Sequence, residues 1–176
     1  MDTEVVRRGI EAVESFERVD RPAEAAQRRV RRALPDGRAT ELAAGRWLGH
    51  PVHPVLVQVP IGAWLSAAVL DLVPGQERAA RRLVATGLVT APLAAVAGLV
   101  DLRDLDRRQL RVAAVHALSN LAATASYAMS YRCRSRGDRT AGRFWAWLGL
   151  AAVGLGGTLG GHLSYAQGAG VGRWRR

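Results

Sequence analysis

Residues 144–165 read FWAWLGLAAVGLGGTLGGHLSY and contain no charged side chain over 22 positions. Three further stretches have the same character, at residues 52–73, 83–100 and 112–131. Asp71 is the one charged residue inside the four stretches, although the chain carries 25 arginines and 15 acidic residues. A helix needs about 20 apolar residues to cross the hydrocarbon core of a bilayer. The sequence therefore predicts four transmembrane helices.

Arginines flank these stretches, and loops of nine to twelve residues join each stretch to the next. Loops this short make consecutive helices antiparallel. Aromatic residues typical of a membrane–water interface, such as Trp145 and Tyr131, lie near the ends of the stretches. We therefore expect an all-α integral membrane protein, with an up-down-up-down four-helix bundle over residues 50–172 and a basic tail at residues 173–176.

Residues 1–49 differ in composition, with ten arginines and nine acidic residues. Apolar residues recur there at helical spacing, at Val6, Ile10, Val13 and Phe16. This spacing predicts an amphipathic helix over residues 3–19. Pro22 is expected to begin a second helix, which the turn signal Pro35-Asp36-Gly37 ends. We expect this helical extension to lie on the membrane surface or to cover one end of the bundle.

The distribution of charged residues indicates which class of partner the protein binds. The net charge is +10, and every basic residue is an arginine. Acidic residues are interspersed among the arginines, and no basic face carries the regularly placed aromatics on which single-stranded nucleic acid stacks. We therefore expect no nucleic-acid partner. The arginines are assigned to codon bias and to the flanks of the membrane helices, and the expected partner is the lipid bilayer.

The distribution of arginines also predicts an orientation. The side that holds both chain ends carries slightly more arginines than the two loops on the opposite side. Positively charged residues are enriched in cytoplasmic loops of membrane proteins. The sequence thus favours a multi-pass protein of the cell inner (plasma) membrane with both termini in the cytoplasm.

The sequence contains no recognisable catalytic motif. It has no nucleophile–base pattern, phosphate-binding loop or paired catalytic carboxylates. Cys133 is the single cysteine, which excludes an internal disulfide, a cysteine-based zinc site and an iron–sulfur cluster in this chain. These absences argue against a hydrolase or a kinase, and they favour a protein that is not an enzyme on its own.

The carboxylates near the predicted membrane helices are expected to pair with arginines. Asp71 lies at the end of the first stretch, and Arg81 or Arg82 is its expected partner. Asp101 and Asp104 follow the second stretch, where they are placed to orient an imidazole or to pair with a neighbouring arginine.

The four histidines fall on one side of the predicted bundle. His50 and His53 stand at the start of the first stretch. His116 lies four residues into the third stretch, and His162 lies three residues before the end of the fourth. Because the first and third stretches run in one direction and the fourth runs back, all four histidines lie on the N-terminal side. Ionisable residues within a membrane are costly, so they are functional candidates by default.

The spacing of these residues suits cofactor binding. Imidazole is the commonest metal ligand in proteins. The segment His50-Pro51-Val52-His53-Pro54 holds two histidines three residues apart, and Asn120 follows His116 by one helical turn, where its amide would orient that ring. The candidate cofactor-binding residues are His53, His116, His162 and Asn120. A metal site would draw on His50, His53, His116 and His162.

Three interpretations of these histidines stay open. They are hydrogen-bonded residues at the membrane interface that hold helix ends together, or imidazole ligands of a b-type haem inside a helix bundle. In the third interpretation they form a non-haem metal site or a proton relay.

Three motifs carry a resemblance to a known family. They are Trp47-Leu48-Gly49-His50-Pro51-Val52-His53-Pro54, Val115-His116-Ala117-Leu118-Ser119-Asn120 and Leu159-Gly160-Gly161-His162-Leu163-Ser164-Tyr165. With these motifs the chain resembles an uncharacterised family of bacterial four-helix membrane proteins, a domain of unknown function. The resemblance extends from about Ala33 to Val171. In actinobacteria such a domain is often fused N-terminal to a Rieske iron–sulfur domain, which implies that related proteins work near electron transfer.

The histidines and the resemblance together predict a redox or electron-transfer accessory subunit with a histidine-ligated haem b or metal ion. The chain has no Cys-x-His pair, so a Rieske-type or other redox partner would be a separate protein. The alternative is a non-catalytic structural or assembly protein without a cofactor, whose glycine-rich fourth stretch packs against a partner. A bound cofactor distinguishes the two hypotheses.

Overall fold

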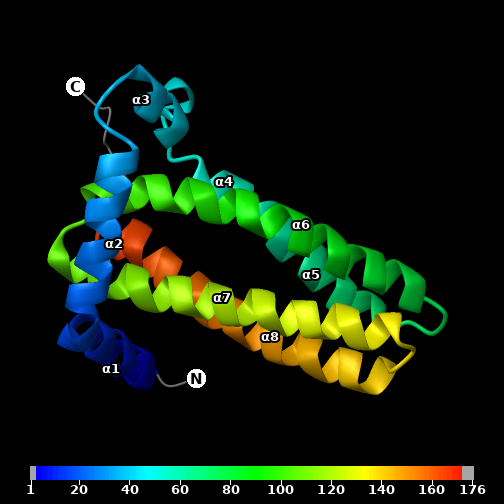
Figure 1. The fold of residues 1–176 in the computed structure, drawn as a ribbon. Helices are drawn as coiled ribbons and strands as arrows, with labels where there is room; N and C mark the ends of the chain where they lie inside the picture. The colour runs from blue at the N-terminus through cyan, green and yellow to red at the C-terminus, as the bar shows by residue number, and fades with distance from the viewer. Residues whose placement is uncertain (1–2, 172–176) are drawn as a thin grey trace. The chain divides into compact units, whose positions relative to one another are not determined.

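A computed structural model of the chain describes residues 3–171. The described residues form helices, turns and loops, with no strand among them, and the all-α prediction is confirmed (Figure 1). The α-helices are α1 (Thr3–Glu14), α2 (Asp20–Ala33), α3 (Arg38–Ala44), α4 (His53–Leu56), α5 (Gln58–Leu70), α6 (Glu77–Asp101), α7 (Arg107–Ser135) and α8 (Arg139–Gly161). The shorter elements are the 3₁₀ helices η1 (Glu17–Val19), η2 (Arg46–Leu48) and η3 (Leu102–Asp104) and the π-helix η4 (His162–Ala166).

Three segments have both the length and the hydropathy of a membrane-spanning helix. They are His53–Leu70, Glu77–Asp104 and Arg139–Ala166. The remaining predicted span, residues 112–131, lies within α7, which is 29 residues long. A histidine, an asparagine and several hydroxyl side chains lower the mean hydropathy of α7. The described structure therefore shows three candidate membrane spans, together with a fourth long helix of more polar composition.

The first predicted span is interrupted, and proline explains the interruption. The helix breaks between α4 and α5, at Val57. Pro60 has no N–H to donate to the carbonyl of Leu56, four residues earlier, and its ring crowds that carbonyl. The expected continuous helix over residues 52–73 therefore becomes two helices, the second of which ends at Leu70.

The helical extension at the N-terminus is also divided differently from the prediction. The helix predicted over residues 3–19 ends at Glu14, where the Ser15 hydroxyl donates hydrogen bonds to the carbonyls of Glu11 and Ala12. Such side-chain bonds compete with continuation of the helix. The second helix begins at Asp20 and so includes Pro22 in its first turn, where a proline costs no hydrogen bond. The short helix α3 was not expected from the sequence.

The described chain divides into two compact units. The terminal unit comprises the described residues up to Val52 together with Ala97–Leu118 and the residues from Gly156 onward. The central unit comprises His53–Val96 and Ser119–Leu155. Helices α6, α7 and α8 each contribute residues to both units. The predicted basic tail at residues 173–176 lies outside the described residues.

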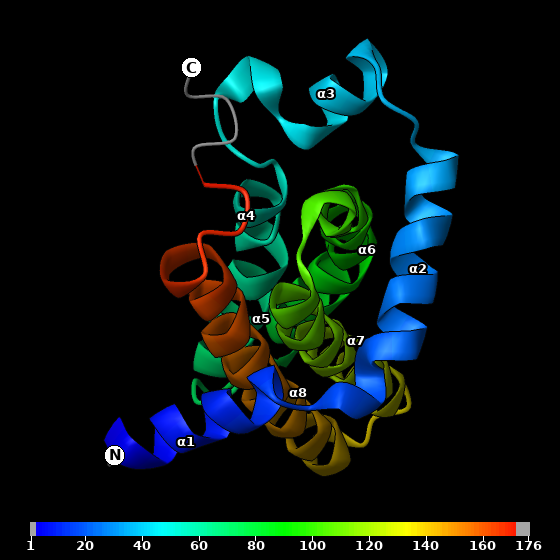
Figure 2. The ribbon, with the colours of Figure 1, turned by 90° about the vertical axis from the view of Figure 1, so that its left-hand side faces the viewer.

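In the terminal unit, α1 and α2 are docked against the neighbouring ends of the long helices (Figure 2). Val112, Leu159 and Leu163 form its small buried apolar cluster, and Val13 of α1 packs against them. The buried side chain of Gln27 in α2 donates hydrogen bonds to the carbonyls of residues 102 and 105, at 2.9 and 2.8 Å. The extension therefore covers this end of the long helices, as one of the two predicted placements requires.

In the central unit, the apolar core is built around an aromatic pair. The rings of Trp64 and Tyr127 are stacked, with centroids 4.2 Å apart and planes 8° from parallel. Gly87 and Gly149 lie against this pair, and an added Cβ would come within 2.1 Å of the Trp64 ring at Gly87 and within 2.8 Å of the Tyr127 ring at Gly149. Both glycines are therefore required for the close approach of helices in this core.

The predicted pairing of Asp71 with Arg81 or Arg82 is wrong. Asp71 accepts two hydrogen bonds, of 2.7 and 2.5 Å, from the guanidinium of Arg134 near the end of α7. Both side chains are 5% exposed. Gly142 makes room for Arg134, because a Cβ there would lie 2.6 Å from the arginine Cγ. Arg134 is 63 residues away in the sequence, so local spacing could not identify it.

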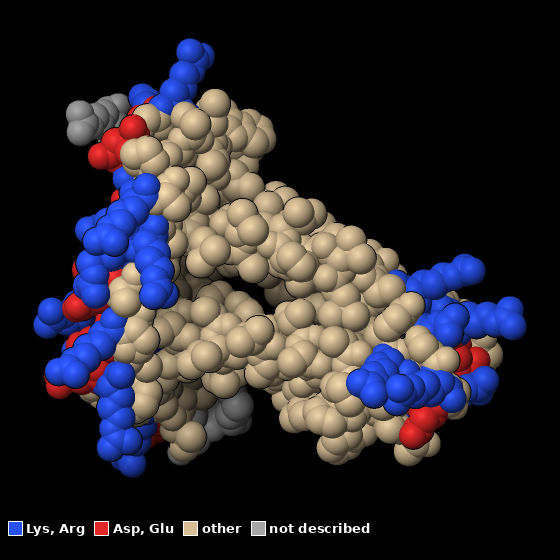
Figure 3. Space-filling view, in the orientation of Figure 1, with Lys and Arg blue, Asp and Glu red and all other residues tan. Residues whose placement is uncertain are grey.

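Charged side chains gather at one end of each unit. In Figure 3 they cover α1, α2 and the adjoining start of α7 in the terminal unit. In the central unit they cover the loops that join α5 to α6 and α7 to α8. Uncharged residues form the surface along the long helices, where many large apolar side chains are exposed. This distribution is typical of helices that pass through lipid.

Candidate functional site

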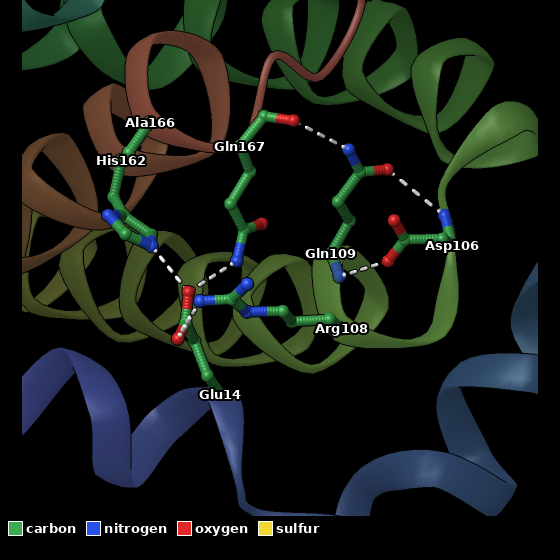
Figure 4. Close-up of a pocket in the computed structure, with 7 residues that line it drawn as sticks. All are labelled: Glu14, Asp106, Arg108, Gln109, His162, Ala166 and Gln167. Carbon is green, nitrogen blue, oxygen red and sulfur yellow. Dashed lines mark hydrogen bonds and ion pairs between the residues drawn. The ribbon is translucent and has the colours of Figure 1, made fainter.

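Glu14, the last residue of α1, is the centre of a polar cluster in the terminal unit (Figure 4). Its side chain is 10% exposed. Oε1 accepts hydrogen bonds of 2.7 Å from both His162 Nε2 and Gln167 Nε2, and Oε2 accepts one of 2.6 Å from Arg108. One carboxylate therefore joins α1 to the start of α7 and to the π-helical end of α8.

The surroundings of Glu14 favour its charged form. Burial raises the pKa of the carboxyl, but the hydrogen bonds from Arg108, His162 and Gln167 outweigh it and lower the pKa from 4.5 to about 2. An ionised carboxylate only accepts hydrogen bonds. His162 Nε2 therefore carries a hydrogen and donates a hydrogen bond to Glu14, so in a neutral ring the lone pair lies on Nδ1.

The cluster borders two pockets. A pocket of about 260 Å³ is lined by Glu14, Asp106, Arg108, Gln109, His162, Ala166 and Gln167. Gln109 orders one wall, because its amide donates to the carbonyl of Gln167 at 3.0 Å and accepts from the backbone N–H of Asp106 at 3.0 Å. A second pocket, of about 390 Å³, shares Glu14, Arg108 and His162 with the first.

A partly buried ion pair holds the chain just after Glu14. Arg111 of α7 donates two hydrogen bonds, of 2.7 and 2.8 Å, to the carboxylate of Asp20 at the start of α2. A third nitrogen of this guanidinium donates to the backbone carbonyl of Glu14 at 3.1 Å. The two side chains are 15% and 18% exposed. The turn between α1 and α2 is therefore fixed to α7, which positions the Glu14 carboxylate.

His116 also lies in the terminal unit. Its Nδ1 is 2.8 Å from the carbonyl oxygen of Gly156 in α8. Its ring lies against Gly160, where an added Cβ would be 3.0 Å from the ring Cε1. Because a carbonyl only accepts, Nδ1 is the protonated nitrogen, and in the neutral ring Nε2 carries the lone pair.

The remaining predicted site residues lie elsewhere in the chain. His53, in the central unit, has its Nδ1 2.7 Å from the carbonyl oxygen of Ala94 in α6. His50 is exposed, and Asn120 is half-buried one turn after His116 on α7. Within the described residues, no three His, Cys, Asp or Glu side chains gather in the arrangement of a metal site. The metal and cofactor assignments therefore stay predictions.

Sequence reasoning missed Glu14 as the partner of His162, and it missed Arg108 and Gln167 as the other donors to Glu14. Glu14 is 148 residues from His162, so no spacing rule connects them. The signal that was present is weaker: Val13 and Glu14 end an amphipathic helix at the point where its apolar face must meet the bundle. A carboxylate that becomes buried at such a helix end needs a positively charged or hydrogen-bonding partner, because burying an unpaired charge is costly.

Comparison with curated proteins and with solved structures gives no match. The sequence profile of one protein family does match, over residues 49–173, and that family is described as a predicted membrane protein, DUF2231. The match covers the four predicted membrane helices, two of the three motifs in full and the first motif from Gly49 onward, and it begins after Glu14. The resemblance to an uncharacterised membrane family is thereby confirmed, and the chain belongs to the DUF2231 family of predicted membrane proteins.

Proposed function

We propose that α7 spans the membrane together with the three candidate spans, giving the up-down-up-down four-helix bundle. At about 1.5 Å per residue its 29 residues reach roughly 44 Å, more than the about 30 Å of a hydrocarbon core. No charged residue occurs from Val112 to Tyr131. Three of its hydroxyl side chains are buried, those of Ser119, Ser126 and Ser130. These three hydroxyls are thus turned away from lipid. We assign the bundle to the plasma membrane with both termini cytoplasmic, because the side that holds both chain ends carries slightly more arginines.

We propose further that the protein is a redox accessory subunit, with His116 and His162 as ligands of a haem b or a metal ion. The observation that carries this proposal is that one ring nitrogen of each histidine donates a hydrogen bond to an oxygen of the protein. A ligating histidine commonly donates its other ring N–H to a carbonyl or a carboxylate, which fixes the tautomer. His116 donates from Nδ1 to a carbonyl, and His162 donates from Nε2 to the Glu14 carboxylate.

Of the other predicted ligands, His53 fits the same chemistry and His50 does not. His53 has its Nδ1 on a carbonyl oxygen, as a ligating histidine would. His50 is exposed and serves as a reserve ligand in this proposal, and Asn120 is assigned the orientation of a ring. When bound, a haem or a redox metal would supply one-electron transfer, and the electron partner would be a separate Rieske-type or other redox protein.

A second candidate function is that of a structural or assembly protein without a cofactor. The observation that favours it is that each histidine bond joins two different helices. His53 joins α4 to α6, His116 joins α7 to α8, and His162 joins the end of α8 to α1. Interhelical hydrogen bonds of this kind stabilise membrane helix bundles by about 0.6–2 kcal/mol each.

Spectra and metal analysis of the purified protein test the first proposal. The protein is extracted in mild detergent from haem-replete cells, and absorption is recorded before and after dithionite, with elemental analysis of the same sample. We expect a Soret band that shifts on reduction, or stoichiometric iron or copper. A sample with no Soret band and no bound iron, copper or zinc would contradict the proposal.

Two substitutions of His116 separate the hypotheses further. In His116→Asn the amide nitrogen takes the place of Nδ1, so the bond to Gly156 is retained while the ligand nitrogen is lost. In His116→Gln the amide reaches the Nε2 position, and the bond to Gly156 is lost. A cofactor ligand predicts loss of the cofactor in His116→Asn. A purely structural residue predicts a stable His116→Asn and a destabilised His116→Gln.

A further inference from the structure

The segment formed by α3 and η2 presents large apolar side chains to the outside. We call residues 38–49 the α3–η2 hairpin. Within it Leu42, Trp47 and Leu48 are 49%, 68% and 38% exposed. None of these side chains contributes to the buried apolar clusters. Exposed apolar side chains that gather in one short segment indicate an interaction surface.

The backbone of the α3–η2 hairpin is fixed by local contacts. Gly45 ends α3 in the left-handed conformation, with φ +97°. A Cβ at this glycine would lie 2.1 Å from the carbonyl oxygen of His50, so the chain folds back tightly over it. An ion pair between Glu41 and Arg46 and a hydrogen bond of 2.7 Å from the Thr40 hydroxyl to the carbonyl of Pro35 add to this order. The apolar side chains are therefore held outward by a preformed turn.

The chain itself places this hairpin near the membrane. The first candidate span begins at His53, six residues after Trp47. Six residues reach about 20 Å even when fully extended. Trp47 therefore cannot lie farther than about 20 Å from the first residue of a membrane-spanning segment. Tryptophan is enriched at the membrane–water interface, where its apolar ring and polar N–H are both accommodated.

We propose that the α3–η2 hairpin is an interfacial anchor, with Trp47, Leu42 and Leu48 in the headgroup–acyl boundary of the leaflet on the histidine side. A short amphipathic segment binds there through its buried apolar area and through attraction of its basic residues to anionic lipid. Arg38 provides the net positive charge, because Arg46 is paired with Glu41. The hairpin would thereby set the depth at which the first span enters the bilayer. This role does not depend on a bound cofactor.

A site-specific fluorophore tests the depth of Trp47. The full-length protein carries Cys133→Ser and Trp47→Cys, is labelled with an environment-sensitive dye, and is reconstituted in phosphatidylcholine–phosphatidylglycerol nanodiscs. Asp36→Cys in the same background is the control, because Asp36 has a fully exposed side chain two residues before the hairpin. Quenching is measured with a nitroxide lipid and with aqueous iodide.

We expect the nitroxide lipid to quench the dye at position 47 at least twofold more than the dye at position 36, and iodide to do the reverse. Equal access of iodide to both dyes would overturn the proposal. Protection of position 47 from both quenchers would overturn it too, because a protein surface, such as a second copy, would then cover the hairpin.

An unlabelled variant provides a second measurement should the cysteine variant fold poorly. In Trp47→Phe, the emission lost relative to the unsubstituted protein is the emission of Trp47. We expect that difference spectrum to be quenched by nitroxide lipid and to resist iodide. A difference spectrum that iodide quenches fully would contradict an interfacial position.

Discussion

Glu14 shows how one carboxylate connects a peripheral helix to a membrane domain. It accepts hydrogen bonds from an arginine, a histidine and a glutamine, and all three lie within the part of the chain that matches the family. Glu14 itself precedes that part. The carboxylate is thus the point at which a segment outside the family profile is joined to the membrane helices.

The low pKa of Glu14 predicts acid-sensitive docking of α1. A carboxyl whose pKa is lowered from 4.5 to about 2 contributes stability that is present above pH 4.5 and is lost as the pH falls toward 2. We expect hydrogen-exchange protection of the α1 amides to decrease over this interval. Hydrogen exchange in nanodiscs, measured from pH 6 to pH 2.5, checks the prediction.

The matched variants are Glu14→Gln and Glu11→Gln. Glu14→Gln should weaken docking of α1 by about 1–3 kcal/mol and remove most of the acid dependence, because buried donors lose a charged acceptor. Glu11 is exposed and pairs with the exposed Arg7, so Glu11→Gln should change stability by less than about 0.5 kcal/mol. An acid dependence that is the same in both variants would assign it to other carboxyl groups.

An added methyl group is expected to affect stability differently at two glycines of α8. At Gly160 a Cβ would lie 3.0 Å from Cε1 and 3.3 Å from Nδ1 of the His116 ring, which its hydrogen bond to Gly156 holds in place. Gly157 faces open space. Gly157→Ala should be neutral or stabilising by up to about 1 kcal/mol, because alanine has the higher helix propensity.

Gly160→Ala should be less stable than Gly157→Ala by about 1–3 kcal/mol, because crowding of a fixed ring offsets that gain. Thermal unfolding in detergent, with both variants compared to the unsubstituted protein, measures the difference. Equal melting temperatures for the two variants would show that the His116 ring moves aside without cost.

At the scale of elements, the buried ion pair between α5 and α7 predicts a large loss of stability. Asp71→Asn leaves the Arg134 guanidinium buried without a carboxylate, and removal of one member of such a pair costs about 3–5 kcal/mol. Glu77→Gln breaks the exposed pair with Arg139 and should cost at most about 1 kcal/mol. Denaturation in mixed micelles compares the two variants. Similar losses would mean that water reaches Arg134.

The helices also show which of their features can be predicted from the sequence. Uncharged runs identified the long helices, because lipid excludes charge over a length that a helix must span. Their ends were shifted, since a helix continues beyond the hydrocarbon region for as long as its residues favour it: α6 begins at Glu77 and α7 at Arg107, within charged sequence. Pro60 accounts for the break before α5, and it is visible in the sequence.

At the scale of the whole molecule, the proposed topology predicts which loops share a side of the membrane. Fusions of alkaline phosphatase and of a fluorescent protein at residues 75, 105 and 137 and at the C-terminus report the side of each point. We expect residues 75 and 137 on one side, and residue 105 and the C-terminus on the other. If α7 does not span, residues 105 and 137 will share a side.

The fold class and the long helices follow from the sequence alone, and so does the prediction that the histidines lie on one side of the bundle. These follow from local physics: charge is excluded from lipid, and helix direction alternates when loops are short. Only the tertiary structure decided the partners. His162 with Glu14, Asp71 with Arg134, and His116 with Gly156 join residues 40 to 148 positions apart. Such pairs depend on which helices meet and at which height, and glycines such as Gly142 and Gly160 allow that contact by leaving room for the partner side chain.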